Sequence, residues 1–386
     1  MRKIVFLPFI FLVTFLFSYI KSDDRTVSDN QFNERINYSE NSSLPGEVRT
    51  YPVKTAAYWT SPIMRGNDIV NLAKHDLVIV DLENKFNNRQ SLVELKRLNP
   101  GIKILAYSNP MEIFLTKYTN RPWQNQVIEE IINHRSQWLL STITTYTTND
   151  GKKHQQGYAT FWPSMVMLNM SASCPKVKGE IYPKWIAKKL VNEVLNDPIW
   201  DGYFQDNGTP NISWTHPGRI DINGNLKADR DAVVDKTWEK GMEIFLRIVR
   251  RALGPNKIII MNKGDNSFSK YADGKFFEKF PNDYLGDKWA GGWRQSVHNA
   301  QRTGQFTIFQ VERHEIMFGL ASALLLDNVY LAISQDDAGI FPELMDINLG
   351  RVFGRFQATG PVYTREYERG TVRVEPLARR GEIINR

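Results

Sequence analysis

The segment Asp201-Gly-Tyr-Phe-Gln-Asp-Asn-Gly208 has the character of a buried strand that ends on a carboxylate. Its aromatic residues favour extended structure, whereas the Asp206-Asn-Gly208 that follows does not favour continuing it. In barrels and doubly wound sheets of parallel strands, catalytic side chains gather at the edge where the strands end. Asp206 is therefore placed for acid–base or nucleophilic chemistry, with an Asn-Gly turn as the alternative interpretation of this segment taken alone.

The same pattern recurs along the chain. Four further apolar runs end on acidic side chains: Leu77–Glu83, Gly274–Glu278, Phe306–Glu312 and Val329–Asp337. Because parallel strands present their carboxyl ends at one edge, we expect these carboxylates to line a common groove. The recurrence favours a catalytic edge over a set of unrelated turns.

Short apolar runs alternate with amphipathic stretches from Lys54 onward. The predicted strands are Thr55–Thr60, Leu77–Leu82, Lys103–Ser108, Asp201–Gln205, Lys257–Asn262, Gly274–Glu278, Phe306–Gln310 and Val329–Ser334. The predicted helices are Gln90–Leu98, Gln124–Leu140, Pro183–Leu195, Asp229–Leu253, Lys288–Gln301 and Glu315–Leu326. This alternation predicts the α/β class and one (β/α)8 barrel of the TIM type over residues 51–345. An open doubly wound sheet is the alternative, but it would normally show a glycine-rich first turn.

Two segments do not fit a minimal barrel. The stretch from Met111 to Tyr182, after the third predicted strand, is a long insert, and loops of this length on a barrel usually shape a substrate groove. Residues 346–386 change to a period of two around Arg369-Gly370. This tail predicts a β-hairpin that begins a small C-terminal β-domain.

The first fifty residues indicate export. Met1-Arg-Lys3 is basic and Ile4–Ile20 is apolar, which is the pattern of a signal peptide over residues 1–20. No A-x-A cleavage site follows, so an uncleaved anchor that tethers the protein to a membrane through residues 4–20 is the alternative. Residues 21–50 are polar without a period and predict a disordered linker. The expected location is therefore secreted or in the cell envelope.

The composition excludes several classes of site. The single cysteine, Cys174, excludes an internal disulfide and a cysteine-based metal cage, and the six histidines contain no HxH or HxxxH pair. Since there is also no GxGxxG after a strand and no Walker-type loop, no cofactor and no metal is expected. From Arg351 onward there are eight arginines against four acids, but no nucleic-acid-binding signature accompanies them. A monomer without a nucleic acid partner is expected.

The order of motifs resembles a known family. The motifs are Leu-Ala-Tyr-Ser-Asn109, Asn169-Met-Ser-Ala-Ser-Cys-Pro175, Asp-Gly-Tyr-Phe-Gln-Asp-Asn207, Phe-Phe-Glu-Lys-Phe-Pro281 and Tyr-Thr-Arg-Glu-Tyr-Glu-Arg-Gly370. Over roughly residues 54–376 the chain resembles the bacterial hypothetical glycosyl hydrolases of (β/α)8 fold, which are related to α-galactosidase and polygalactosaminidase-like barrels. The resemblance implies a carbohydrate-active barrel with acids on the fourth and a later strand, but it implies no particular substrate.

Glycoside cleavage needs two carboxyl groups on either side of one bond. In the related retaining barrels the fourth-strand aspartate is the nucleophile and the acid lies on the sixth strand, which implies these roles for Asp206 and Glu278. The aromatic neighbour Phe280 is expected to desolvate Glu278 and raise its pKa, as suits a general acid. Glu312, which ends the seventh strand, is the main alternative to Glu278.

Further residues at the predicted strand ends are expected to bind substrate. They are Asp81, Glu83, Tyr107, Asn109, Asn207, Asn262, Gln310, Glu312, Asp336 and Asp337. The candidate aromatic platforms are Trp59, Trp162, Trp289 and Trp293, with core packing expected for at least half of them. The alternatives are a helix cap or turn for Asp336 and Asp337, and a salt bridge to Arg313 for Glu312.

These observations predict an exported hydrolase that cleaves O-glycosidic bonds in a bacterial polysaccharide with two carboxylates, with retention favoured. The alternative is a non-catalytic glycan-binding or polysaccharide assembly or export protein, which Gln205 in the fourth strand and Lys279 beside Glu278 leave open. A third hypothesis is a peripheral protein whose basic tail binds anionic surfaces.

Overall fold

The computed structural model describes residues 54–147, 153–281, 289–302, 306–338 and 347–386, which belong to one compact unit. The predicted signal peptide or anchor and the predicted linker lie outside these residues. Within the described ranges, no helix is both long enough and apolar enough to span a membrane.

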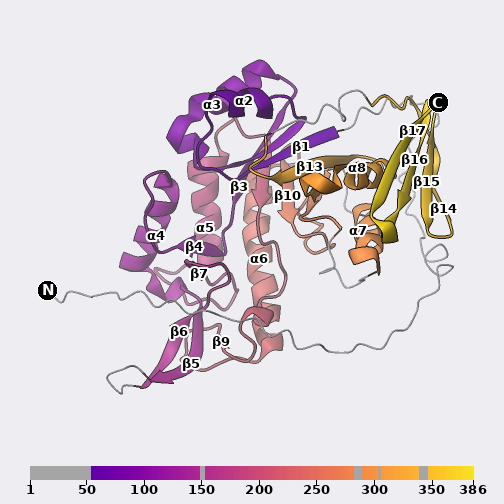
Figure 1. Cartoon of the computed structure of the whole chain (residues 1–386). Coiled ribbons are helices and arrows are strands. Elements are labelled where there is room, and N and C mark those ends of the chain that lie inside the picture. The colour runs from indigo at the N-terminus through magenta and orange to yellow at the C-terminus, as the bar shows by residue number, and fades with distance from the viewer. Residues whose placement is uncertain (1–53, 148–152, 282–288, 303–305, 339–346) are drawn as a thin grey trace. The chain divides into compact units, whose positions relative to one another are not determined.

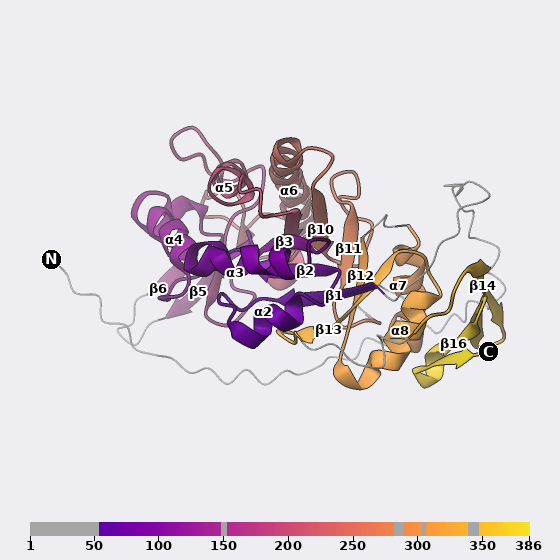
Figure 2. The same ribbon diagram turned by 90° about the horizontal axis from the view of Figure 1, so that it is seen from above.

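Eight parallel strands form a closed barrel (Figures 1 and 2). They are β1 (Lys54–Trp59), β2 (Leu77–Asp81), β3 (Lys103–Ser108), β8 (Gly202–Gln205), β10 (Ile258–Asn262), β11 (Gly274–Phe277), β12 (Thr307–Val311) and β13 (Val329–Gln335). Each strand pairs with its neighbours in chain order, and β1 closes the ring by pairing with β13. The predicted α/β class and (β/α)8 barrel are confirmed, and every predicted strand overlaps an observed one.

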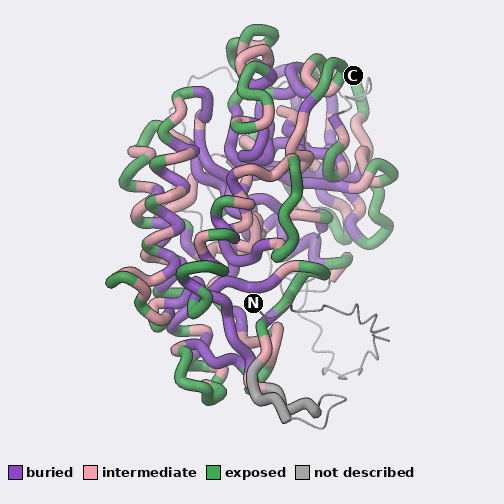
Figure 3. The backbone as a smooth tube through the Cα atoms, turned by 90° about the vertical axis from the view of Figure 1, so that its left-hand side faces the viewer, coloured by how far each residue is buried: buried purple, intermediate pink, exposed green. Residues whose placement is uncertain are grey.

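Alternate residues of the barrel strands face two different cores, because side chains alternate along a strand. Inside the barrel, Tyr58, Phe204 and Phe276 pack on one another with ring centroids 4.8 to 5.6 Å apart. The intervening residues, such as Tyr203, face the helices. Figure 3 shows buried residues gathered towards the middle of the described chain, with exposed residues on its outer turns.

The helices lie outside the barrel (Figure 2). They are α2 (Gly66–Leu72), α3 (Asn84–Leu98), α4 (Pro122–His134), α5 (Tyr182–Leu190), α6 (Asp231–Leu253), α7 (Trp293–Ala300) and α8 (Ile316–Leu324), with a π-helical turn at Val191–Leu195 after α5. The short 3-10 turns are Ser136–Trp138, Ser213–Thr215, Trp289–Gly291, Arg313–Glu315 and Pro376–Ala378. Helix α2 has no counterpart among the predicted helices. Leu72 is the only buried side chain among its seven residues, so its apolar pattern is too short to recognise.

Residues 263–273, between β10 and β11, form turns in place of a helix. This loop covers the outside of β11, where the buried Lys275 Nζ donates to the carbonyl of Ser267. Burial lowers the pKa of Lys275 to about 8, since desolvation disfavours the ammonium. The barrel is therefore regular in its strands and irregular in its outer layer.

The insert after β3 forms a subdomain beside the barrel (Figure 1). It holds α4, a two-stranded sheet of β4 (Glu112–Phe114) and β7 (Met165–Met167), and the strands β5 (Ser141–Thr147) and β6 (Lys153–Tyr158). Strand β9 (Ile220–Asp221), from the loop after β8, pairs with β5 and completes a three-stranded sheet. The helix predicted to reach Leu140 ends at His134, because Arg135 leaves the helical region at φ −145°. A Cβ on Gly241 of α6 would lie 1.8 Å from the carbonyl oxygen of Met170, so this glycine allows α6 to pack directly on the insert.

The C-terminal residues form an antiparallel sheet of β14 (Val352–Thr359), β15 (Val362–Tyr367), β16 (Gly370–Glu375) and β17 (Arg380–Asn385). Tyr367 pairs with Gly370 across the predicted hairpin turn, which confirms that hairpin. The sheet packs on α8, where the Tyr367 hydroxyl donates to the carbonyl of Leu324.

The arginines of this sheet are extensively paired with its own acids. Arg373 contacts Glu382 at 3.2 Å and Glu375 at 2.5 Å, and Arg351 contacts Glu368 at 3.5 Å. These ion pairs lie within the sheet, and its eight arginines still outnumber its four acids, so the segment keeps a net positive charge.

Candidate active site

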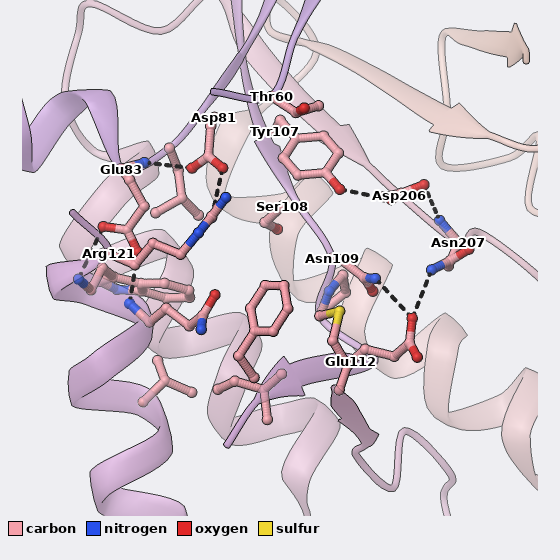
Figure 4. A pocket seen from close by; sticks show the side chains of 18 of the residues that line it. Thr60, Asp81, Glu83, Tyr107, Ser108, Asn109, Glu112, Arg121, Asp206 and Asn207 are labelled. Atoms are coloured by element: carbon pink, nitrogen blue, oxygen red, sulfur yellow. Dashed lines mark hydrogen bonds and ion pairs between the residues drawn. The ribbon is translucent and has the colours of Figure 1, made fainter. Parts of the chain in front are cut away.

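A cavity of about 330 Å³ opens at the carboxyl ends of the barrel strands, between the strands and the insert (Figure 4). Its walls include Asp206 and Asn207 after β8, Glu278 after β11, and Tyr107 of β3. Residues predicted from separate stretches of sequence therefore meet in one cavity, because the parallel strands end at the same edge.

Asn262, the last residue of β10, joins the two predicted catalytic carboxylates. Its Nδ2 donates to Asp206 Oδ1 and to Glu278 Oε2, over 2.8 Å in each case. Because β10 lies between β8 and β11 in the barrel, its terminal side chain reaches both neighbouring strand ends.

The turn after β8 fixes the position of Asp206. Asp206 N–H donates to the carbonyl of Ser108 on β3 (2.9 Å), and Asn207 then takes φ 53°, a left-handed conformation that asparagine tolerates. Asp206 Oδ1 accepts the backbone N–H of Asn207 (2.8 Å), and Oδ2 accepts the hydroxyl of Tyr107 (2.7 Å). The Asp-Asn-Gly turn thus orients the carboxylate and does not merely reverse the chain.

Burial raises the pKa of Asp206 above its usual value, and the hydrogen bonds from Tyr107, Asn262 and Asn207 act against that rise. Burial also raises the pKa of Glu278, and the nearby charge of Asp206 adds to the effect. Asn262 and Lys279 oppose it in part. Asp206 therefore has three donors that favour its ionised form, whereas Glu278 has a like charge that favours its protonated form.

Gln310 of β12 positions the segment that carries Glu278. Its Oε1 accepts the N–H of Lys279 (2.7 Å) and its backbone carbonyl accepts the N–H of Phe280 (2.7 Å). Phe280 stacks on Phe309, with ring centroids 3.9 Å apart. Gln310 was predicted to bind substrate, but the structure gives it a supporting contact and does not place it on the cavity wall.

Glu112, at the start of β4, is a cavity carboxylate that the sequence interpretation missed. It is buried, its Oε1 accepts the N–H of Trp162 (3.0 Å), and its Oε2 accepts the side-chain amides of Asn109 (3.2 Å) and Asn207 (3.3 Å). Burial raises its pKa. Glu112 lies only four residues after the end of the third strand, and this proximity could have indicated it. It was missed because only residues at the strand ends themselves were considered.

Asp81 and Glu83 lie at the other end of the cavity (Figure 4). Asp81 Oδ2 accepts Arg121 Nη1 (2.9 Å), and the two oxygens of Glu83 accept the N–H groups of Trp123 (3.1 Å) and Gln124 (2.8 Å) at the start of α4. Burial raises the pKa of Asp81, and it raises that of Glu83 to about 7. Both acids were predicted to bind substrate, and both line the cavity. Both also tie the insert to the barrel.

The acids predicted on β12 and β13 form local contacts outside the cavity wall. Glu312 Oε2 accepts the hydroxyl of Ser334 (3.2 Å), and Asp337 pairs with Arg313 (2.5 Å). Asp336 Oδ1 accepts the N–H of Thr60 (2.5 Å) and so joins the ends of β1 and β13. Of the two candidate acids, Glu278 lines the cavity and Glu312 does not.

The four candidate platforms divide between core and surface. Trp59 and Trp293 are buried, with their indole N–H groups donating to Ile63 O (3.4 Å) and Ser322 Oγ (2.9 Å). Trp289 packs against Arg294. Trp162 is exposed and lines the cavity.

Gln205 and Lys279, the two residues that left a non-catalytic role open, do not line the cavity. Gln205 is fully buried, and its Nε2 lies 3.9 Å from the sulfur of Met242 on α6, outside the barrel wall. Lys279 contributes its backbone to the contact with Gln310. In the described part of the chain, no group of three or more histidine, cysteine or acidic side chains is arranged to hold a metal ion.

Several solved structures are similar to this chain. One is a noncanonic maltogenic α-amylase from Thermotoga neapolitana, with 10% identity, 84% of this chain and 86% of that chain covered, and a TM-score of 0.45. A GH31 dextranase from Flavobacterium johnsoniae has 12% identity, coverage of 76% and 38%, and a TM-score of 0.46. An α-N-acetylgalactosaminidase from Bifidobacterium bifidum has 9% identity, coverage of 87% and 56%, and a TM-score of 0.39. The chain thus spans less than two thirds of the length of the last two.

No curated protein matches the chain. The model of hypothetical glycosyl hydrolase family 15, in contrast, matches residues 96–371, which include both Asp206 and Glu278. This match covers well over half of the 386 residues and agrees with the family suggested by the order of motifs. The chain is a glycoside hydrolase that belongs to hypothetical glycosyl hydrolase family 15.

Proposed function

We propose that the protein is an exported, retaining glycoside hydrolase that cleaves O-glycosidic bonds in a polysaccharide, with Asp206 as nucleophile and Glu278 as general acid and base. The observation that carries this proposal is the amide of Asn262, which donates to both carboxylates over 2.8 Å. Two carboxyl groups held at one cavity are what glycosidic cleavage requires.

Two oxygens of the proposed pair lie close together, as a retaining pair requires. Asp206 Oδ1 and Glu278 Oε2 lie no more than 5.6 Å apart, which is twice the 2.8 Å from each oxygen to Asn262 Nδ2. Carboxyl groups about 5–5.5 Å apart are typical of retaining enzymes, and about 6.5–9.5 Å of inverting ones, which place a water between acid and base.

The proposed reaction has two steps. Asp206 attacks the anomeric carbon while Glu278 gives its proton to the glycosidic oxygen, so that the carbon–oxygen bond to the leaving sugar breaks and a glycosyl ester forms on Asp206. Glu278, now ionised, takes a proton from a water whose oxygen attacks the same carbon. The ester bond breaks, the free sugar leaves, and both carboxyl groups return to their starting states.

The surroundings of the two acids suit these roles. A nucleophile must be ionised, and three hydrogen-bond donors favour that state of Asp206. An acid must hold its proton near neutral pH, and burial together with the charge of Asp206 raises the pKa of Glu278. The proposed export rests on the basic and apolar pattern of residues 1–20.

The test is the release of reducing ends from a panel of purified exopolysaccharides, from about pH 4 to 8. Wild-type protein should release them from at least one polymer, and Asp206→Asn and Glu278→Gln should not. Glu312→Gln is the matched control, because that acid does not line the cavity. Proton NMR of the first product should show the anomeric configuration of the substrate.

Two results would contradict the proposal. Calorimetric binding of a polymer without any release would indicate a glycan-binding protein. Loss of activity in Glu312→Gln with activity retained in Glu278→Gln would transfer the role of the acid to the seventh strand.

A further inference from the structure

An exposed aromatic cluster lies at the rim of the cavity, and it consists of Phe161, Trp162 and Trp214. Phe161 contacts both tryptophans edge to face, with ring centroids 5.3 Å from Trp162 and 5.1 Å from Trp214. The side chains are 37%, 52% and 51% exposed, respectively. All ten tryptophans of the chain fall within the described residues, and only these two are exposed. Large apolar rings that gather on a surface mark an interaction site.

The cluster is rigidly attached to the segment that carries Asp206. Glu112 accepts the backbone N–H of Trp162 with one carboxylate oxygen and the amide of Asn207 with the other. Because Asn207 directly follows Asp206, one buried acid fixes the distance between the cluster and the proposed nucleophile.

Trp214 is held from a second side. It lies in the turn Ser213–Thr215, which is part of the long loop after β8. Asp235 of α6 accepts the N–H groups of Ile212 (2.8 Å) and Ser213 (2.9 Å) and the hydroxyl of Ser213 (2.7 Å). The rings are therefore presented on fixed backbone, which reduces the entropy lost when a ligand binds.

We propose that the aromatic cluster is a second sugar-binding subsite, on which a ring of the polysaccharide stacks while another ring of the same chain occupies the cavity. Trp162 belongs to both the cluster and the cavity wall, so a ligand that leaves the cavity at this rim passes directly onto the cluster. Sugar rings have apolar C–H faces that pack on aromatic rings and polar edges that remain in water, which suits half-exposed tryptophans. The inference rests on the proposed function and adds that the enzyme prefers long chains.

The experiment measures affinity by calorimetry in the inactive Asp206→Asn protein. The probes are isomaltohexaose, cellohexaose and chitohexaose, each compared with its disaccharide. At least one hexaose should bind more tightly than its disaccharide. Trp214→Ala should weaken that hexaose by roughly three- to tenfold and leave the disaccharide unchanged.

Matched variants separate stacking from folding. Trp214→Phe retains a flat ring and should lose less affinity than Trp214→Ala, and Phe161→Ala should resemble Trp214→Ala. Phe353→Ala removes a side chain that is 50% exposed on β14 and should leave hexaose affinity unchanged.

The inference is overturned if no hexaose binds more tightly than its disaccharide, or if Trp214→Ala and Phe161→Ala both bind hexaose as the parent protein does. Failure of the proposed function gives a different result. In that case wild-type protein releases no reducing ends, although the loss of hexaose affinity in Trp214→Ala would still establish the subsite.

Discussion

The hydroxyl of Tyr107 donates to Asp206 Oδ2 over 2.7 Å, from the barrel strand next to the one that Asp206 follows. Burial raises the pKa of Tyr107 well above its usual value, so the hydroxyl keeps its proton and stays a donor. The charge on the proposed nucleophile is therefore stabilised from β3, by a side chain whose position the barrel itself fixes.

Tyr107→Phe should lower kcat/KM by roughly ten- to a hundredfold, because a hydrogen bond to a charged group is lost. The pKa of Asp206 should rise further, so the acidic limb of the pH–rate profile should move to higher pH. The control is Tyr203→Phe, which loses a 2.9 Å hydrogen bond to Ser108 on the helix-facing side of the sheet. Equal profiles for the two variants would contradict this role of Tyr107.

Asp206→Asn should reduce turnover at least ~10³-fold, since the amide cannot form a glycosyl ester. The free energy of unfolding should change by no more than about 1 kcal/mol, because relief of a buried charge offsets the altered hydrogen bonds. Urea unfolding measures the second quantity. Asp201→Asn is the control at the opposite end of the same segment, where Asp201 pairs with Lys96 and accepts the N–H of Ile104 (2.8 Å). That variant should lose stability and keep its turnover.

Glu83 should make the protein less stable as pH rises from about 4.5 to 7. A carboxyl whose pKa is about 7 when folded, against 4.5 for an unperturbed glutamate, costs the folded state about 3 kcal/mol once it is ionised. The folded chain binds more protons than the unfolded chain in this window, so the free energy of unfolding falls with pH and levels off above 7. Urea unfolding between pH 4.5 and 8 tests this, and Glu83→Gln should show a smaller slope than wild type.

Arg121→Met should destabilise the protein by about 2–4 kcal/mol, because it leaves the buried carboxylate of Asp81 without its cation. The double variant Asp81→Asn with Arg121→Met should recover part of that loss. A double-mutant cycle by urea unfolding measures the coupling. If the two single variants were additive, the pair would have no structural role between the insert and the barrel.

The strands could be predicted because their residues are apolar on both faces and lie between polar, helix-forming stretches. Lys103–Ser108 was predicted with both ends correct, and β8 to within one residue. The architecture of the insert could not be predicted in this way, because its short strands such as β4 and β7 depend on partners more than fifty residues away. Helix α2 was missed for a related reason, since its seven residues carry too short an apolar pattern.

The site was predictable where it follows from strand ends and not where it follows from the insert. Asp206, Glu278 and Asn262 meet because β8, β10 and β11 are neighbours, which the order of strands alone implies. Glu112 and Arg121 reach the same cavity from the insert, whose path no local pattern reveals. Trp59 was a candidate platform but packs in the core. The sequence could not show this, because a tryptophan residue by itself does not indicate whether its side chain is buried or exposed.

The barrel is closed by pairing of its first strand, β1, with its last, β13. At this junction Asp336 accepts the N–H of Thr60, which lies 276 residues earlier in the chain. A polypeptide cut short after Val311 would contain both proposed catalytic acids, yet β1 and β12 would each present an unpaired edge. Unpaired edges of buried strands promote aggregation. Premature termination or proteolysis in that region is therefore expected to give insoluble fragments and no partially active enzyme.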